Sequence, residues 1–219
     1  MIDHILLLVS DLEAYQTQFQ EVTQVAPTYG GVHPSARASN ALIDMGNGTY
    51  LELIGPALDG TEGPLTPTLR KLEEPRLSWF AMRSEDLQQD VERLESAGFE
   101  HSGIQEIEFE SEIRNKIRYS AVVAINHDWG DQMPFFINWG DTPHPTTTSN
   151  GGLTLTSFTV YHPDAESLAQ VYDQLNVDVV VEHAEQPGFR LEFNSLGGDV
   201  VYQSSTPSPV FSVPLEVNE

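Results

Sequence analysis

The sequence predicts an α+β protein in which a unit of one strand, one helix and further strands repeats in tandem. Three short apolar or β-branched runs carry this prediction, because each is followed by a helix-start signal and then by apolar residues at helical spacing. These runs are His4 to Val9, Ser78 to Met82 and Ser157 to Tyr161. Strand-like segments follow each helical stretch, so the repeated unit is described as βαβββ.

The helix after each run is predicted to be amphipathic. At the start of the first helix, Ser10 and Glu13 have the spacing of a capping box. Apolar side chains then recur every three or four residues, which predicts one buried face per helix and a sheet that this face covers. The predicted buried faces are Leu12, Tyr15, Phe19 and Val22 in the first helix, Leu87, Val91 and Leu94 in the second, and Leu168, Val171, Tyr172 and Leu175 in the third.

The strands after the helices are predicted from runs rich in β-branched and aromatic residues that end near a glycine. Asn47-Gly48 is a strong signal for a tight turn between two of them. The runs are 40–45 and 50–54, then 117–125 and 135–139, then 177–181, 189–193 and 199–203. They place the units at residues 1–56, 77–141 and 152–204, with Pro/Gly/Thr-rich connections between them and a C-terminal tail at 205–219.

The composition excludes several classes of function. The 219 residues include 33 acidic and 10 basic side chains, a formal net charge of -23 at pH 7. This charge repels phosphate backbones and anionic lipid headgroups, so we expect neither nucleic acid nor a membrane as a partner. Solubility or a salt-adapted source explains such an acidic protein, and the alternative is steering of a cationic ligand. The absence of cysteine excludes disulfides, Cys-ligated zinc, iron–sulfur clusters and thiol catalysis.

The N-terminus does not have the pattern of a signal peptide. Asp3 stands where a basic region is needed, and the apolar run from Ile5 to Val9 is too short for a signal core. No segment approaches the length of a membrane span. We therefore expect a cytoplasmic protein.

His4 and Glu52 are the strongest candidates for a functional site. His4 alternates with Leu6 and Leu8 on one face of the first strand. Glu52 lies between two leucines in a strand that should be buried, where an unpaired carboxylate would be costly, so a histidine, a cation or a metal should lie near it. We predict that the His4 ring and the Glu52 carboxylate point into one cavity, within about 6 Å of each other.

Several motifs, in this order, resemble the vicinal oxygen chelate superfamily and, within it, the glyoxalase-like domain family. The first unit opens with Ile2-Asp3-His4-Ile5 and closes with Tyr50-Leu51-Glu52-Leu53-Ile54-Gly55. The other matches are Gly30-Gly31-Val32-His33-Pro34 with Asn40-Ala41-Leu42, Pro134-Phe135-Phe136-Ile137-Asn138-Trp139, Leu153-Thr154-Leu155-Thr156-Ser157, and His162-Pro163-Asp164. The resemblance covers about residues 1–175 and its motifs are loose when taken singly.

This resemblance implies a cupped mixed β-sheet, made by pairing of the units at 1–56 and 77–141, with helices on its outer face. It also implies one divalent metal ion, such as zinc, nickel, manganese or iron, held by the first and last strand of each unit. His4 and Glu52 match the ligand positions of the first unit, whereas Ser78 and Asn138 match those of the second. Serine and asparagine are weak ligands for these metals, which puts the metal in doubt.

A third metal ligand would be Asn138, His127 or Glu192. His127 belongs to a polar turn before the strand at Phe135, and it is either the tip of a hairpin or a side chain that reaches the cavity. Glu192 holds the position of Glu52 in the third unit, and it becomes a ligand if units one and three form the cup.

Further side chains are expected to contact a substrate. His33 follows two glycines and precedes a proline, which predicts a loop whose backbone approaches a ligand, while Asn40 supplies a second polar contact. Asn138 and Trp139 close the second unit and complete the predicted substrate contacts.

Two functional hypotheses follow. The first is a lyase, isomerase or dioxygenase-type enzyme in which a metal held by His4 and Glu52 stabilises an anion of a small organic substrate. The second is a metal-free binding protein for drug-like or metabolite ligands, favoured by the serines at both later positions equivalent to His4. Metal-free acid–base chemistry by the same pair is also open. The partner is a small molecule in each case, and a homodimer stays open. No GxSxG, P-loop or GxGxxG motif supports a hydrolase or a Rossmann oxidoreductase.

Overall fold

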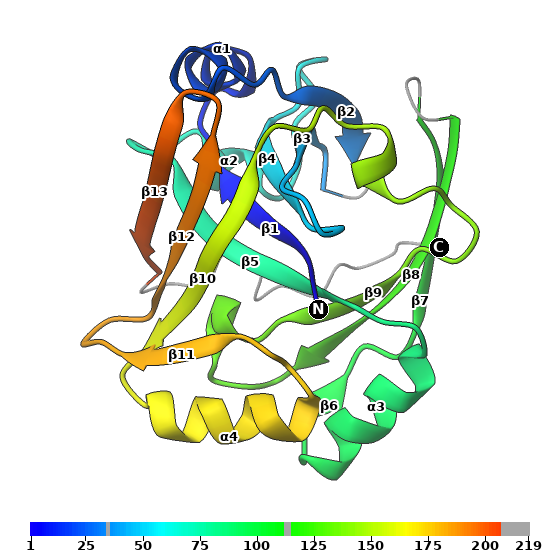
Figure 1. Cartoon of the computed structure of the whole chain (residues 1–219). Coiled ribbons are helices and arrows are strands. Elements are labelled where there is room, and N and C mark those ends of the chain that lie inside the picture. Colours follow the sequence, from blue (N-terminus) through cyan, green and yellow to red (C-terminus); the bar gives the residue numbers. More distant parts are fainter. Residues whose placement is uncertain (34–35, 112–114, 207–219) are drawn as a thin grey trace.

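Two β-sheets with helices packed against them make up the chain in the computed structural model, which describes residues 1–33, 36–111 and 115–206 (Figure 1). The mixed α+β architecture predicted from the sequence is confirmed. The helices are α1 (Leu12–Thr23), α2 (Thr66–Leu69), α3 (Leu87–Ser96) and α4 (Ala165–Leu175), with 3-10 turns at Gly130–Gln132 and Pro145–Thr147. The strands are β1 (Ile2–Leu8), β2 (Thr28–His33), β3 (Ala38–Asp44), β4 (Tyr50–Pro56), β5 (Arg76–Arg83), β6 (Glu100–His101), β7 (Gln105–Ser111), β8 (Asn115–Ile125), β9 (Phe135–Asn138), β10 (Thr154–His162), β11 (Val180–His183), β12 (Gly188–Ser195) and β13 (Gly198–Ser205).

The larger sheet joins two units of the same topology. Its strand order is β2-β3-β4-β1-β5-β9-β8-β6, and β7 also pairs with β8. In the first unit β1 pairs in parallel with β4, and in the second β5 pairs in parallel with β9. The two units meet where β1 runs antiparallel to β5. The first strands of both units therefore lie side by side at the middle of one sheet.

Residues 154–205 repeat the order of elements but not the pairing. They form a separate sheet with the order β11-β10-β12-β13. Here the first strand, β10, pairs in parallel with β11, the strand that directly follows α4, and antiparallel with β12. A parallel neighbour reached through a helix is the usual βαβ crossover. The strands of this unit therefore pair with one another in a sheet of their own and do not extend the larger sheet. Of the predicted tail, residues 207–219 lie outside the described part of the chain.

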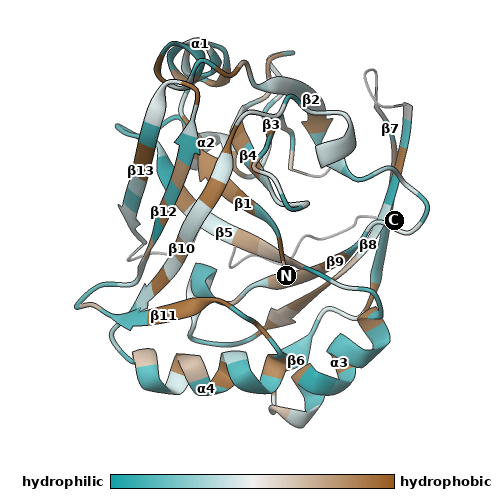
Figure 2. Ribbon diagram, in the orientation of Figure 1, coloured by the Kyte–Doolittle hydropathy of each residue, from teal (hydrophilic) through white to brown (hydrophobic). Residues whose placement is uncertain are grey.

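The main hydrophobic core lies between the two sheets and under α1, α3 and α4. Phe80 of β5 is fully buried there, and its ring meets Phe158 and Phe189 of the smaller sheet edge to face, with centroids 5.2 and 6.2 Å away. Figure 2 shows hydrophobic and hydrophilic residues mixed along α3 and α4, as expected for helices with one buried face. The opposite face of β1 carries Leu6 and Leu8 in a second, smaller cluster.

Most predicted positions on the helices are buried, but the first helix differs from its prediction. Val22 is 54% exposed, and Thr23 is buried in its place. The side chain of Asp11 caps the helix by accepting a hydrogen bond from the Ala14 amide, so the predicted capping box of Ser10 is wrong. Val22 and Thr23 stand three and four residues after Phe19, both on the same side of the helix, and Thr23 is buried with its hydroxyl donating to the Phe19 carbonyl oxygen.

The tight turn at Asn47-Gly48 is confirmed, because both residues have positive φ. The strands β2, β6 and β7 are absent from the sequence prediction. Two glycines interrupt the apolar pattern of β2, whereas the alternation of Ile107 and Phe109 with glutamates in β7 is a strand signal that the prediction did not use. Among the described residues, none of the helices has both the length and the apolar character that crossing a bilayer would require.

We predict that Phe80→Ala lowers the free energy of unfolding by about 3–5 kcal/mol, because it leaves a void between the two sheets. Leu196→Ala, at a side chain that is 71% exposed, is the matched control and should change stability by about 0.5 kcal/mol or less. Urea unfolding followed by circular dichroism measures both. Equal, small effects of the two substitutions would show that the sheets do not depend on this contact.

Candidate functional site

A cavity of about 670 Å³ lies on the face of the larger sheet that carries Leu6 and Leu8. Side chains from both ends of the sheet line it, from β2 and β3 on one side and from β7 and β8 on the other. These ends meet where His33 Nε2 lies 2.9 Å from the Tyr119 hydroxyl. The sheet is therefore curved around the cavity, which has the volume of a site for a small organic molecule. His33 is the last residue of β2 and does not lie on the predicted loop.

His4 lies in this cavity on β1, stacked on Tyr50 with ring centroids 4.7 Å apart and edge-on to Phe135 at 5.4 Å. Its Nδ1 is 2.8 Å from Asp3 Oδ1. Neighbouring side chains in a regular strand point to opposite faces, but the pairing of β1 with β5 shifts register between Ile2 and His4. Asp3 is thus an extra residue in the strand, and this irregularity allows its carboxylate to reach the ring of His4.

Asp3 is fully buried and is surrounded by donors. Besides His4, it accepts hydrogen bonds from Arg83 Nε at 3.0 Å and Trp139 Nε1 at 3.3 Å, and His144 Nε2 lies 3.0 Å away. Burial raises the pKa of the Asp3 carboxyl, but the hydrogen bonds and charge of His144 and His4 lower it more, so this pKa lies below its ordinary value. Because an ionised carboxylate only accepts, the proton of His4 is assigned to Nδ1.

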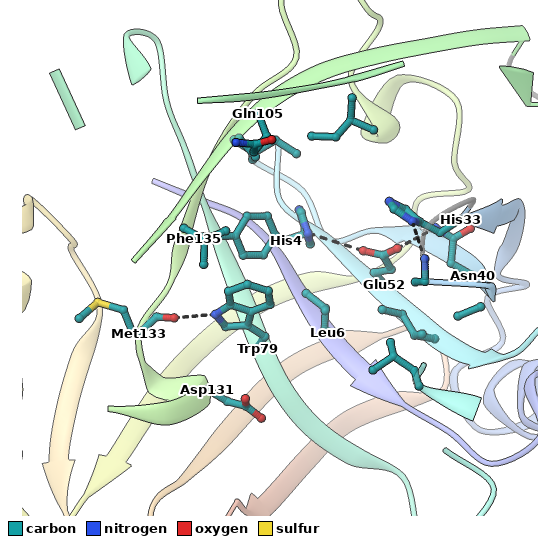
Figure 3. A pocket seen from close by; sticks show the side chains of 18 of the residues that line it. His4, Leu6, His33, Asn40, Glu52, Trp79, Gln105, Asp131, Met133 and Phe135 are labelled. Atoms are coloured by element: carbon teal, nitrogen blue, oxygen red, sulfur yellow. Dashed lines mark hydrogen bonds and ion pairs between the residues drawn. The ribbon is translucent and has the colours of Figure 1, made fainter. Parts of the chain in front are cut away.

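Glu52 faces His4 from the neighbouring strand β4 (Figure 3). Its Oε1 accepts a hydrogen bond of 2.7 Å from Asn40 Nδ2, and its Oε2 lies 3.6 Å from His4 Nε2. The side chain is 15% exposed, and both residues line the cavity. The predicted geometry is confirmed: the pair shares one cavity at less than 6 Å. The catalytic or binding role of the pair remains a prediction.

Two further polar side chains, His33 and Tyr119, lie near Glu52 in the cavity. Burial lowers the pKa of His33 while the Glu52 carboxylate opposes that shift, and burial together with Glu52 raises the pKa of Tyr119. Both groups are therefore uncharged at neutral pH. Asn40 Oδ1 is buried and accepts no hydrogen bond from the described part of the chain, although it lies at the cavity wall beside Gly30. A bound molecule with an N–H or O–H group would satisfy it.

The structure does not bring together the residues predicted to complete a metal site. Asn138 does not line the cavity, because its Nδ2 donates to the Ser84 carbonyl oxygen at 2.9 Å. Glu192 lies on the smaller sheet, where it accepts a hydrogen bond from Ser157 and pairs with Arg190. The structure therefore places Asn138 and Glu192 away from the cavity that holds His4 and Glu52, where the sequence analysis expected them.

Ser78 is also absent from the cavity, since its hydroxyl donates to Asp131 Oδ2 at 2.6 Å. The pairing of β1 with β5 shifts again between Ile5 and Leu7, so two residues of β5 lie opposite Leu6. Trp79, and not Ser78, faces the cavity as a result. A superposition of the units without gaps could not show this extra residue.

The residues present do not fit a catalytic metal ion. His4 and Glu52 supply two strong metal ligands. The second unit contributes the aromatic side chains of Trp79 and Phe135 to the adjoining wall of the cavity. His127 does line the cavity, and its Nε2 contacts the Ala124 carbonyl oxygen at 3.2 Å. Throughout residues 1–33, 36–111 and 115–206, no three or more His, Asp or Glu side chains are grouped to hold a metal. A catalytic site of the zinc type needs three protein ligands.

Trp139 lines the cavity as predicted, but sequence reasoning did not detect its partner Asp3 or the other donors around that carboxylate. Arg83 and His144 are 80 and 141 positions away from Asp3 in the chain. Their side chains meet because β5 ends beside the start of β1, and because the segment after β9 passes the same end of these two strands. No local pattern signals such a long-range contact.

Comparisons with known proteins agree with this fold. The sequence profile of a glyoxalase-like domain matches residues 2–176, and no functionally curated protein matches the chain. A hypothetical protein from Staphylococcus aureus has 16% identity and a TM-score of 0.63, covering 93% of this chain and 85% of its own. A mutant of 4-hydroxymandelate synthase from Streptomyces coelicolor has 15% identity and a TM-score of 0.53, covering 93% of this chain and 62% of its own.

Methylmalonyl-CoA epimerase from Mycobacterium tuberculosis has 18% identity and a TM-score of 0.43, covering 62% of this chain and 84% of its own. At these identities the two structures with TM-scores of 0.63 and 0.53 show a likeness of fold alone. The family profile covers both units of the larger sheet, the buried pair of His4 and Glu52, and the strand β10 with α4. The chain belongs to the glyoxalase-like domain family.

Proposed function

We propose that this protein is an enzyme that transfers a proton at a carbon atom of a small organic substrate, in an isomerase- or lyase-type reaction. The observation that carries the proposal is the pairing of Glu52 Oε2 with His4 Nε2 at 3.6 Å inside the cavity. This distance is longer than a hydrogen bond, so each atom keeps its capacity to interact with a substrate.

Glu52 is the proposed base. Its Oε1 is held by Asn40, which fixes the direction of Oε2. A fixed carboxylate in a largely apolar cavity is suited to take a proton from a carbon next to a carbonyl group. The proton moves to Oε2, the electron pair of the C–H bond forms a C=C bond, and the π pair of the carbonyl group moves to its oxygen, so the substrate becomes an enolate.

His4 is the proposed acid. Its Nδ1 donates to Asp3, and when the ring takes up a second proton, at Nε2, this buried carboxylate stabilises the positive charge. The Nε2 proton then stabilises the enolate oxygen, or moves to it. Return of the proton from Glu52 to another carbon completes an isomerisation, and departure of a leaving group from the enolate completes an elimination.

A metal-free binding protein is the second candidate. It is favoured by the aromatic wall of Trp79 and Phe135, which occupies the side of the cavity where the second unit was expected to supply polar ligands. In that function Glu52 and His4 would only orient a ligand. Measurement of proton exchange separates the two candidates, since a binding protein does not exchange carbon-bound protons.

We predict that the protein accelerates deuterium incorporation from D₂O into the carbon next to the carbonyl of phenylacetone. Glu52→Gln should slow this exchange by about 10²–10⁴-fold, because the amide keeps the shape and the contact with Asn40 but cannot accept the proton. Proton NMR follows the loss of the C–H signal. Glu21→Gln removes the same charge from an exposed site on α1 and should leave the rate unchanged. Exchange that persists in Glu52→Gln would rule out Glu52 as the base.

We predict that Asp3→Asn lowers the free energy of unfolding at pH 7 by about 3–5 kcal/mol, because Arg83 and His144 lose their buried partner. The pKa of Asp3 is lower in the folded chain than its ordinary value of 3.8. Its contribution is therefore complete above about pH 4 and decreases as the pH falls below that value, so the difference from wild type should shrink by about 1 kcal/mol at pH 3.

Urea unfolding at pH 7 and pH 3 measures this difference. Asp173→Asn, at an exposed position of α4, is the control and should have little effect at either pH. A destabilisation by Asp3→Asn that stays the same at both pH values would contradict an ionised, stabilising Asp3.

A further inference from the structure

We propose that the cavity selects its ligand by charge: it accepts aromatic or otherwise apolar molecules that are cationic or neutral, and it rejects the corresponding anions. The inference rests on the proposed function because it names the substrate class of the same cavity. It is tested by binding alone, so a protein without proton-transfer activity can still satisfy it.

The charges at the cavity wall are the first observation. Among the described residues that line it, none is lysine or arginine, whereas Glu52, Asp128 and Asp131 contribute carboxylates. Arg83, the nearest cation described above, is engaged by Asp3 and by the Gly48 carbonyl oxygen. An anion that enters this cavity would lose its hydration without gaining a cationic partner, which is costly.

Of the four histidines that line the cavity, His4, His33 and His127 do not add an unmatched positive charge. Burial lowers the pKa of His33, and the charge of Glu52 opposes this shift. Burial also lowers the pKa of His127, and a hydrogen bond to the Ala124 carbonyl oxygen opposes it. His4 faces Glu52 and is bound to Asp3, so two carboxylates already surround its ring. None of these three rings therefore offers an anion a positive charge that is not already matched by a carboxylate.

The hydrogen-bonding groups at Glu52 also favour a donor on the ligand. Glu52 Oε2 is an acceptor, and Asn40 Oδ1 is a second buried acceptor without a hydrogen bond from the described chain. Both side chains project into the same part of the cavity in Figure 3. An ammonium group placed there could donate to both oxygens and a hydroxyl group to one of them, whereas a carboxylate could donate to neither.

Aromatic rings from the second unit of the larger sheet line another part of the wall. Trp79 and Phe135 lie with ring centroids 4.5 Å apart, and Tyr119 and Trp139 with centroids 5.2 Å apart. All four line the cavity. Such rings bury apolar groups, and their faces attract cations. The net charge of -23 adds a long-range field that raises the local concentration of cations and is screened by salt.

Calorimetric titration with three matched compounds tests the proposal: 2-naphthylmethylamine, 2-naphthylmethanol and 2-naphthoate. At pH 7 in 0.15 M salt, the amine and the alcohol should each bind at least about tenfold more tightly than the carboxylate, because only the anion is repelled by the carboxylates of the wall. The preference against 2-naphthoate should persist in 0.5 M salt, since interactions inside the cavity are screened less than those at the surface.

Two variants locate the effect. Glu52→Gln should weaken binding of the amine by about tenfold while leaving the alcohol within about twofold, because it removes the charge and keeps the shape. Glu21→Gln removes one charge from the exposed surface of α1 and should alter neither affinity. Binding of 2-naphthoate as tight as that of the alcohol would overturn the proposal. Absence of binding by all three compounds at millimolar concentration would overturn it as well.

Discussion

The buried carboxylate of Asp3 is the constraint on which the site depends. It brings together His4 on β1, Arg83 at the end of β5, and Trp139 and His144 from the segment after β9. A fully buried, ionised carboxylate is stable here because both of its oxygens lie within hydrogen-bonding distance of donors. The same contacts that satisfy it fix the orientation of the His4 ring, so the contact between the two units also positions the proposed acid.

The two units of the larger sheet share a topology but not a chemistry. The first unit supplies Glu52 and His4, and the second supplies Trp79 and Phe135 in the adjoining wall. A symmetric cup with ligands from both units would hold a metal, whereas this asymmetric cup presents one polar pair beside aromatic rings. In the proposed function, the apolar body of a ligand packs on the second unit while its reactive or donor group lies at Glu52.

The fold and the central pair could be predicted from the sequence because their signals are local and repeated. Apolar runs before amphipathic helices marked β1, β5 and β10, and the isolated charge of Glu52 in a leucine-rich strand marked a buried partner. The errors arise where strands are irregular. One extra residue in β1 brings Asp3 to His4, and one extra residue in β5 puts Trp79 in place of Ser78. The pairing of β10 with β11 likewise depends on tertiary contacts, and the order of elements did not specify it.

The most direct test of the account is the protonation state of the His4 ring. Long-range proton–nitrogen correlation NMR of ¹⁵N-labelled protein, with His4→Gln used for assignment, reports which ring nitrogen carries the proton. The account predicts that Nδ1 stays protonated up to alkaline pH, held by Asp3, and that Asp3→Asn removes this preference. A neutral His4 ring protonated at Nε2 in the wild-type protein would contradict it, because Asp3 would then not determine which atom faces Glu52.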